Sequence, residues 1–597
     1  MKKIYKALAL FIAGFAFISC DSMLDLKPLS SPTDETFFSD ETELQLALNS
    51  VYGSMPLFEI EHMPFQMYME AVLSDNSFYR ITDEQAGLQA LSKSEQTSTS
   101  GFEKFYENLY KGIGRANNLL QNMDKASGVV NETQFNDIKA QALCMRAYFY
   151  HRLVLYFGDV PYLDFVPTTP DQAFLPRTPK EEILDTILAD LDNAASLMDK
   201  GITGVQDRIT LPFVYAIKAR IALYAGRFDV AATAAQMSLE QAEANGYQLH
   251  PSYGELFTFD GEDSPEILMR LPYNEEGFGK SHRIVLRFGT RFGTYSQCGP
   301  AQNLIDAYLT KNGLPIDEDP EYDPTNPWEN RDPRLKATVV LPQDLWAGRI
   351  YESHPDSLES YKIENGVKSR ELNRNCRSVH WPAYLSGYLY RKYVDETSLA
   401  ERTTKTDVDL HFMRLAEVYL ILAEAEIERN GGDLNKAASA INKLRERAWS
   451  GEDDYPAVTA TSKEQMRKVL RMERRVELAM EGFRYDDLLR WRMLEKVRTI
   501  PFVGRVLDLK NAKTVPSIDM DGIVTYPDMS EYDKWQYMRN EDGSVKEEGY
   551  TPTYKERWHN AWNRKFNPDR DYLFPIPQSE IDLYEANGKT LPQNKGY

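Results

Sequence analysis

Several long segments of the chain place apolar residues at spacings of three and four, which predicts helices that pack along one face. These segments are residues 39–52, 102–123 and 135–157, and Ser39 is a suitable N-cap for the first of them. These three segments are therefore predicted to be helical, and a loop-like stretch, residues 74–83, lies between the first and the second.

A capping box marks the start of another helix. Thr178 is predicted to be the N-cap, Pro179 takes the first helical position, and Glu181 lies three residues after the cap. Together these residues satisfy the free N–H groups of a first helical turn. The pattern predicts a helix that ends near Met198.

Two segments predict pairs of antiparallel helices that are joined by a short turn. In residues 211–244, small side chains allow the helices to approach closely, Gly226 permits the turn, and Phe228 fills the space beyond it. The second pair, residues 412–448, turns at residues 430–433. Each pair resembles a tetratricopeptide unit, and the two lie roughly 200 residues apart, so we expect a scaffold assembled from distant parts of the chain.

Residues 250–405 and 500–572 differ from the helical segments. They contain most of the Pro, Gly, Asn and Asp turn signals and only short apolar runs, which predicts long loops with short strands and helices. Long ordered loops on a rigid scaffold are where binding function usually lies. The predicted fold class is therefore mainly α, with a tetratricopeptide-like helical-pair scaffold and a loop-rich, ligand-facing half.

The long apolar run of the sequence lies at its N-terminus. Lysines precede residues 7–18, which are apolar, and this order predicts a signal peptide over residues 1–19, too short to span a bilayer. Residues 17–20, Phe-Ile-Ser-Cys, resemble a bacterial lipobox with phenylalanine where leucine is usual. Cys20 is thus the predicted lipidation site, followed by a tether over residues 20–38. The alternative is a secreted protein cleaved nearby.

The net charge and the cysteine content argue against several kinds of function and site. The net charge of −21 argues against nucleic-acid binding, which needs a basic surface. Beyond Cys20 there are three cysteines without C-x-x-C spacing, so the sequence supports neither a zinc site nor a disulfide framework. Cys144 is predicted to be a small buried side chain. A bridge between Cys298 and Cys376 stays open.

No motif in the sequence indicates catalysis or a bound cofactor. The eight histidines show no metal-ligand spacing, and the sequence contains no G-x-S-x-G nucleophile motif. Two acidic turns, residues 317–323 and 519–522, lack a complete calcium loop. We therefore predict no catalytic residue, no metal and no cofactor. A carboxylate pair assembled only by the fold would leave no signal in the sequence.

The remaining candidates for ligand binding are aromatic side chains in the loop-like regions, together with their polar neighbours. A sugar presents an apolar face and a rim of hydroxyls, so a ring flanked by amide, carboxylate or guanidinium groups suits it. For each ring the alternative is ordinary core packing. The predicted ligand-binding residues lie in loop-like regions and are Asp75, Asn76, Phe78, Tyr79, Arg291, Tyr295, Trp328, Trp381 and Tyr384.

Residues 473–491 combine an apolar helical stripe with many charges. The stripe consists of Val476, Ala479, Met480 and Phe483. Local ion pairs are predicted for Arg474 with Glu477, Glu481 with Arg484, and Asp486 with Arg490. The charges indicate either a solvated face or a packed ionic network. The position of the segment between the second helical pair and the loop-rich tail favours the network, with a structural role.

The same segment resembles the signature of the SusD/RagB family of outer-membrane nutrient-binding lipoproteins. The similarity rests on Glu481-Gly-Phe-Arg484 and on Asp487-Leu-Leu-Arg-Trp491. Further segments resemble family motifs in the family's order: residues 146–162, 304–308, 312–316, 330–335, 413–425 and 573–581. The resemblance covers nearly the whole mature chain. It implies an N-terminal helical region over residues 39–250 and a C-terminal region over residues 251–597.

The resemblance also implies a place and a partner. It implies a lipoprotein on the outer face of a Gram-negative outer membrane, with four tetratricopeptide-like pairs and a SusC-like TonB-dependent transporter as partner. The implied function is non-catalytic capture of a glycan and its delivery to that transporter. The alternatives are a scaffold that binds a peptide or another protein, and a surface glycosidase. Ligand residues vary across the family, so the predicted residues rest on loop position and aromatic chemistry alone.

Overall fold

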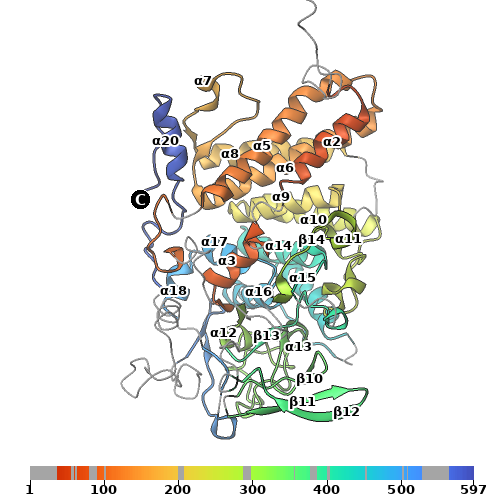
Figure 1. Ribbon diagram of the computed structural model, residues 1–597, viewed down its shortest axis with the longest axis vertical. Coiled ribbons are helices and arrows are strands. Elements are labelled where there is room, and N and C mark those ends of the chain that lie inside the picture. The colour runs from red at the N-terminus through yellow and green to blue at the C-terminus, as the bar shows by residue number, and fades with distance from the viewer. Residues whose placement is uncertain are drawn as a thin grey trace, which may run out of the picture.

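The chain folds into a helical part and a loop-rich part, which occupy the upper and lower regions of Figure 1. The computed structural model describes residues 37–55, 59–60, 63–79, 90–99, 102–198, 207–286, 298–354, 356–376, 379, 386–399, 404–450, 454–500, 503–506, 508–526 and 564–597. Mainly helical structure with short strands is the fold class that the sequence predicted.

The helical part is a succession of packed antiparallel helices. Each helix contacts the next along the series α5 (Glu103–Asn122), α6 (Glu132–Phe157), α8 (Lys180–Leu197), α9 (Leu211–Tyr224) and α10 (Phe228–Ala244), while α2 (Glu41–Tyr52) covers α5 and α6. The series continues as α10 packs against α14 (Leu415–Glu428), which in turn contacts α15 (Leu434–Ala448) and α16 (Lys463–Glu477). The scaffold is therefore built from distant parts of the chain, as predicted.

Small residues set the close approach of these helices. Gly112 of α5 faces Phe149 of α6, and a Cβ atom at Gly112 would lie 2.6 Å from the Phe149 ring. Gly226 takes a φ of 71° in the turn between α9 and α10, a conformation that costs glycine little. Ala231 and Ala235 of α10 are fully buried. Small side chains thus allow α6 to pack closely on α5, and α10 to pack closely on α9.

The predicted capping box at the start of α8 is wrong in detail. Pro179 is the N-cap, and Thr178 lies in strand β5 (Arg177–Thr178), which pairs with β4 (Val160–Pro161). The cap comes instead from a distant side chain, because Asp159 accepts a hydrogen bond from the Lys180 N–H at 2.9 Å. Tertiary contact has replaced the local cap.

The start of α2 differs from its prediction by one residue. Asp40 is the N-cap, and its carboxylate accepts a hydrogen bond from the Glu43 N–H at 2.9 Å. Ser39 donates its own N–H and hydroxyl to the Glu43 carboxylate, at 2.8 and 2.9 Å. The two residues together close the first turn from both sides.

The loop-rich part contains short antiparallel strands. Its largest sheet has the order β12 (Val367–Leu372), β11 (Glu359–Glu364), β10 (Arg349–Ile350) and β9 (Leu345–Trp346), and lies at the bottom of Figure 1. Phe412, predicted to open a helix, lies instead in β14 (Leu410–Arg414), which pairs with β6 (Ile267–Leu271) before α14 begins. The remaining elements are α3 (Phe65–Leu73), α7 (Pro170–Ala173), α11 (Glu275–Phe278), α12 (Gln302–Ile305), α13 (Arg334–Thr338), α17 (Arg484–Arg490), α18 (Leu494–Arg498), α20 (Gln578–Ala586), β1 (Glu59–Ile60), β2 (Met63–Pro64), β3 (Ser77–Tyr79), β7 (Cys298–Pro300), β8 (Val339–Val340), β13 (Leu389–Tyr390), β15 (Ser517–Ile518) and β16 (Val524–Thr525), besides short 3₁₀ turns.

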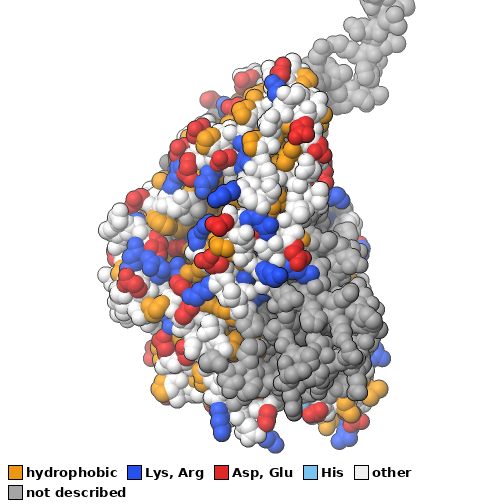
Figure 2. Space-filling model, turned by 90° about the vertical axis from the view of Figure 1, so that its left-hand side faces the viewer, with side chains coloured by type: hydrophobic (Ala, Val, Ile, Leu, Met, Phe, Trp, Pro, Cys, Tyr) orange, Lys and Arg blue, Asp and Glu red, His pale blue; other side chains and the backbone are white. Residues whose placement is uncertain are grey.

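One large apolar core extends through both parts of the fold, and packing therefore crosses the predicted region boundary near residue 250. That division of the chain stays a prediction. At the surface, acidic and basic side chains are interspersed over the described part of the face in Figure 2. Among the helices in the described ranges, none is both long enough and apolar enough to cross a membrane.

Candidate functional site

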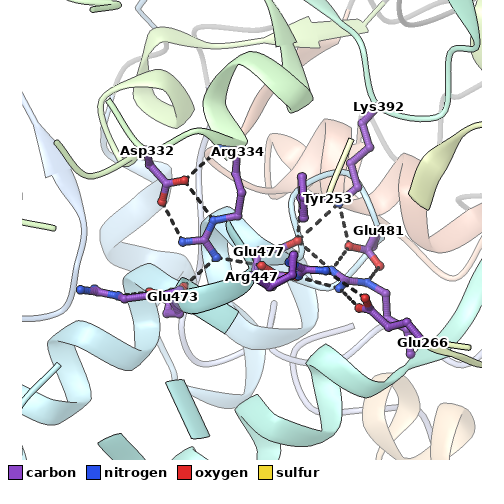
Figure 3. A network of polar contacts seen from close by, with 11 residues as sticks. Tyr253, Glu266, Asp332, Arg334, Lys392, Arg447, Glu473, Glu477 and Glu481 are labelled. Carbon is purple, nitrogen blue, oxygen red and sulfur yellow. Dashed lines mark hydrogen bonds and ion pairs between the residues drawn. The ribbon is translucent and has the colours of Figure 1, made fainter. Parts of the chain in front are cut away.

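A buried ionic network lies where α14, α15 and α16 meet the loop-rich part (Figure 3). Its side chains are at most 5% exposed, and charges of the two signs are equal in number. The carboxylates are Glu266, Asp332, Glu473, Glu477 and Glu481, and the cations are Arg334, Lys392, Arg414, Arg445 and Arg447. This burial confirms the packed-network interpretation of the charged segment.

Glu477 is the centre of this network. Its carboxylate accepts hydrogen bonds from Arg334 Nη1 at 2.8 Å, Arg414 Nη1 at 2.7 Å and Arg447 Nη2. Its backbone carbonyl accepts a hydrogen bond from the Tyr253 hydroxyl at 2.9 Å. Burial alone would raise the pKa of Glu477, but the three guanidinium groups outweigh it and hold this pKa well below its usual range.

Glu481 and Lys392 form the edge of the network. Burial would raise the pKa of Glu481, yet Arg414 and Lys392 lower it to about 2. Burial lowers the pKa of Lys392 to about 8, and Glu481 opposes this by favouring the charged amine. Both groups are therefore charged at neutral pH and are bound to each other at 2.7 Å.

The helix that carries Glu473 and Glu477 ends earlier than the apolar stripe predicted. Helix α16 ends at Glu477, and Met480 and Gly482 take φ values of 63° and 90° in the turn before α17. The Glu70 carboxylate accepts the N–H groups of Met480 at 2.9 Å and Gly482 at 2.7 Å. A carboxylate from α3 thus replaces the helical hydrogen bonds that the turn gives up.

None of the three predicted local ion pairs forms. Arg474 pairs with Asp487, and Arg490 pairs with Asp487 and Glu424. Glu481 pairs with Arg414 and Lys392. Arg152 of α6 bonds to Asp486 at 2.7 Å, and Arg484 bonds to Asp75. The three predicted pairs are wrong because their members bind residues of other elements or, for Arg490 and Asp487, a different neighbour at three-residue spacing within α17.

Gly482 is expected to tolerate no side chain. An added Cβ would lie 2.8 Å from Gln66 Cβ, and the positive φ costs ~1–3 kcal/mol for a residue other than glycine. Gly482→Ala should therefore lower the thermal midpoint more than Gly246→Ala, where φ is 80° and an added Cβ would meet no atom within 4 Å. Differential scanning calorimetry measures both, and equal shifts would contradict the packing argument.

The chemistry of the network is structural. Its charges are paired, most of its carboxylates accept several hydrogen bonds, and their side chains are almost inaccessible to solvent. A general acid or nucleophile must reach a substrate, and these groups do not. The network instead holds helices of the scaffold to the loop-rich part.

Three neighbouring strands carry or adjoin segments of the chain that contain predicted ligand residues. Strands β3 and β7 pair antiparallel, with Tyr79 opposite Cys298, and β13 contacts β7. The hydroxyls of Ser77 and Tyr390 share a hydrogen bond between β3 and β13. Residues 80 and 297 adjoin the paired residues Tyr79 and Cys298, so the segments that contain residues 80–89 and 287–297 start from the same end of the strand pair. The strands bring together the starting points of segments far apart in the sequence.

Trp328 lies beside the segment that leads into β13. Its indole Nε1 donates a hydrogen bond to the Tyr388 hydroxyl at 3.1 Å, and the two rings meet edge to face with centroids 6.4 Å apart. The Arg505 guanidinium lies over the indole, 5.4 Å from its centroid. The ring is half-buried, so it retains an accessible part.

Asp75 and Asn76 are core residues, which corrects their prediction as ligand contacts. They are 3% and 0% exposed. Arg475 and Arg484 bind the Asp75 carboxylate at 3.0 and 2.8 Å, and they hold its pKa well below its usual range although burial acts in the opposite direction. Asn76 bonds to Glu70 and Arg475. Their polar atoms are used within the protein.

The other predicted ligand residues stay predictions. Phe78 and Tyr79 lie in β3, where only the backbone is described. Arg291, Tyr295, Trp381 and Tyr384 lie outside the described residues. The same holds for the signal peptide, for Cys20 and for most of the tether.

The three cysteines beyond Cys20 are buried, and acidic side chains of the two acidic turns bind other groups of the protein. Cys144, Cys298 and Cys376 are buried, and the bridge between the last two does not form. Asp317 accepts the Ile518 N–H, and Lys496 binds Asp519 and Asp521. Within the described ranges, no group of three or more His, Cys, Asp or Glu side chains is arranged to hold a metal ion.

Two family models match the chain. One, described as the SusD family, matches residues 270–597, which is more than half of the sequence. The chain belongs to the SusD family. A second model, described as "Starch-binding associating with outer membrane", matches residues 22–223. Together the two models cover both parts of the fold.

Individual relatives of this SusD-family protein match over most of their length. SusD-like protein P2 of Formosa agariphila is 26% identical over 83% of this chain and 92% of its own. The starch-binding protein SusD of Bacteroides thetaiotaomicron is 22% identical over 83% and 91%. A SusD-like carbohydrate-binding protein of Bacteroides fragilis superposes with a TM-score of 0.70 at 24% identity, covering 92% and 99% of the two chains.

Glu70 is an important residue of this SusD-family protein that sequence reasoning missed. It is 2% exposed, and burial raises its pKa although hydrogen bonds from Asn76, Met480 and Gly482 oppose the effect. A single glutamate within the apolar run Phe65–Leu73 was the available signal, because such a charge is buried only when it is well bonded.

Proposed function

We propose that this protein captures a glycan at the cell surface without cleaving it and delivers it to a SusC-like TonB-dependent transporter in the outer membrane. Membership of the SusD family carries the proposal. Two of the relatives are named starch-binding and carbohydrate-binding proteins. The second family model, which describes association with the outer membrane, supports the location.

The geometry supports the loop-rich face as the binding site. Phe78, Tyr79, Arg291, Tyr295, Trp328, Trp381 and Tyr384 remain the proposed ligand residues. The segments that contain most of them start from the adjoining strands β3, β7 and β13. A few aromatic rings held near one another suit the apolar face of a sugar, and neighbouring polar groups suit its hydroxyls.

The test uses residues 21–597 without the lipid. A glycan array should retain at least one oligosaccharide, and isothermal titration calorimetry should then give a saturable affinity. Chromatography of the glycan after prolonged incubation should show unchanged chain length. Shortened products from protein free of contaminating hydrolase would favour a glycosidase. Retention of peptides but of no glycan would favour the scaffold alternative, and the proposed function would be wrong.

Membrane attachment is expected to depend on Cys20. Cys20→Ala removes the thiol that would carry the lipid, so the protein should move from the membrane pellet to the soluble fraction after ultracentrifugation. Cys144→Ala is the matched control, because that thiol is 1% exposed and lies inside α6. A Cys20→Ala protein that stays in the pellet would show that another segment or a partner provides attachment.

A further inference from the structure

Arg475 joins helix α16 to the strand that carries two proposed ligand residues. Its Nε donates to Asn76 Oδ1 at 2.8 Å. Its Nη2 donates to the Asp75 carbonyl at 3.1 Å and lies 3.0 Å from Asp75 Oδ2. One guanidinium therefore binds both side chains and one backbone carbonyl immediately before β3 begins at Ser77.

Asn76 transmits this contact to the neighbouring strand. Its Nδ2 donates to Glu70 Oε1 at 2.8 Å, and its backbone carbonyl accepts the Ala301 N–H at 2.9 Å. Ala301 follows β7 directly, so this hydrogen bond extends the β3–β7 ladder by one step beyond Ser77 and Pro300. Arg475 thus fixes the end of the strand pair opposite to the end where Tyr79 and Cys298 meet.

The guanidinium geometry is what makes Arg475 suited to this position. It is 2% exposed, and burial lowers its pKa to about 10 while Asp75 opposes the shift, so it stays charged at neutral pH. Its planar fork serves acceptors that lie in different directions at once, whereas a lysine amine acts as a single point charge. Lysine could keep the attraction to Asp75 but not all three contacts.

We propose that Arg475 is a positioning residue for ligand binding, because it anchors the end of β3, the strand whose backbone carries Phe78 and Tyr79. This inference rests on the proposed glycan-binding function. Short strands such as β3 and β7 have few ladder hydrogen bonds of their own, so an anchor at one end strongly limits their motion. A ligand site needs that limit because small displacements of its contacts cost affinity.

Arg475→Lys tests the proposal in a protein expected to fold. Arg484 still binds Asp75 through Nε and Nη2 at 2.8 and 3.0 Å, so the buried carboxylate keeps its charge partners. We expect the Ser77–Tyr79 amides to exchange hydrogen about tenfold faster without ligand, and glycan affinity to fall about tenfold. Asn76→Ala removes the acceptor without changing any charge and should raise the same exchange rates.

Arg474→Lys is the matched control. Arg474 is the adjacent residue of α16, is 1% exposed, and binds Asp487 through Nε and Nη2, both at 3.0 Å, without touching residues 75–76. It should lower stability to a similar degree while leaving β3 exchange and glycan affinity unchanged.

Two outcomes would overturn the proposal: β3 exchange unchanged in both Arg475→Lys and Asn76→Ala, or an equal effect in Arg474→Lys. If the wild-type protein binds no glycan, the proposed function fails, while the exchange measurement without ligand still decides whether Arg475 anchors β3.

Discussion

Replacing Glu477 by glutamine is expected to lower the free energy of unfolding by about 3–5 kcal/mol, because it leaves buried cations without their charge partner. Arg334, Arg414 and Arg447 all donate to this carboxylate, and the side chain is fully buried. Glutamine keeps the size but supplies one uncharged acceptor and two donors that would face guanidinium groups. Urea denaturation followed by circular dichroism measures the loss.

Glu240→Gln is the control for the loss of one negative charge. Glu240 lies on the exposed side of α10, and a substitution there should change stability by at most ~0.5 kcal/mol. A Glu477→Gln protein as stable as Glu240→Gln would mean that the network has reorganised around the missing charge. The interpretation that the ionic network links the helical scaffold to the loop-rich part would then be wrong.

Combined replacement of Tyr79, Trp328 and Trp381 by alanine is expected to weaken glycan binding by about 100-fold or more. Truncating an aromatic side chain is among the changes that cost most binding free energy at an interface. A 100-fold loss of affinity corresponds to ~2.7 kcal/mol of binding free energy. Calorimetric titration with the oligosaccharide selected on the array measures the change. Thermal unfolding of the same protein shows how much of the effect comes from lost Trp328 packing on Tyr388.

Tyr215→Ala provides the matched aromatic control. Tyr215 is half-exposed on α9, in a groove that is lined by α8, α9 and α10 and by no residue of β3, β7 or β13. Its loss should leave the affinity unchanged. Unchanged affinity of the triple variant, with normal unfolding, would place the glycan somewhere other than the loop-rich face.

Periodic sequence signals predicted the helices well and their partners poorly. The helical pairs predicted in residues 211–244 and 412–448 both form. Each depends on local apolar spacing and on a turn in which a glycine, Gly226 or Gly431, takes a positive φ. The sequence showed that Glu473–Trp491 carried too many charges for an ordinary helix. It could not show that the helix breaks after Glu477, because the break is stabilised by Glu70 from α3.

The candidate site was less accessible to sequence reasoning. Asp75 and Asn76 looked like loop residues beside aromatic rings, and the contacts that bury them come from Arg475 and Arg484, about 400 positions later in the chain. Strands of two or three residues, such as β3 and β13, carry no periodic signal. Only the fold reveals that these strands adjoin.

The long sequence separation within the ionic contacts has a consequence for biosynthesis. Arg152 meets Asp486 across 334 positions, and Arg220 meets Glu417 across 197. A nascent chain that has emerged only to the end of α10 carries these cations without their counter-charges, and burying them in that state would be costly. Its helices can form early, but their tight docking must wait until residues 473–490 are also available for pairing. Truncated products that end before this segment are therefore expected to remain loosely packed and open to proteolysis.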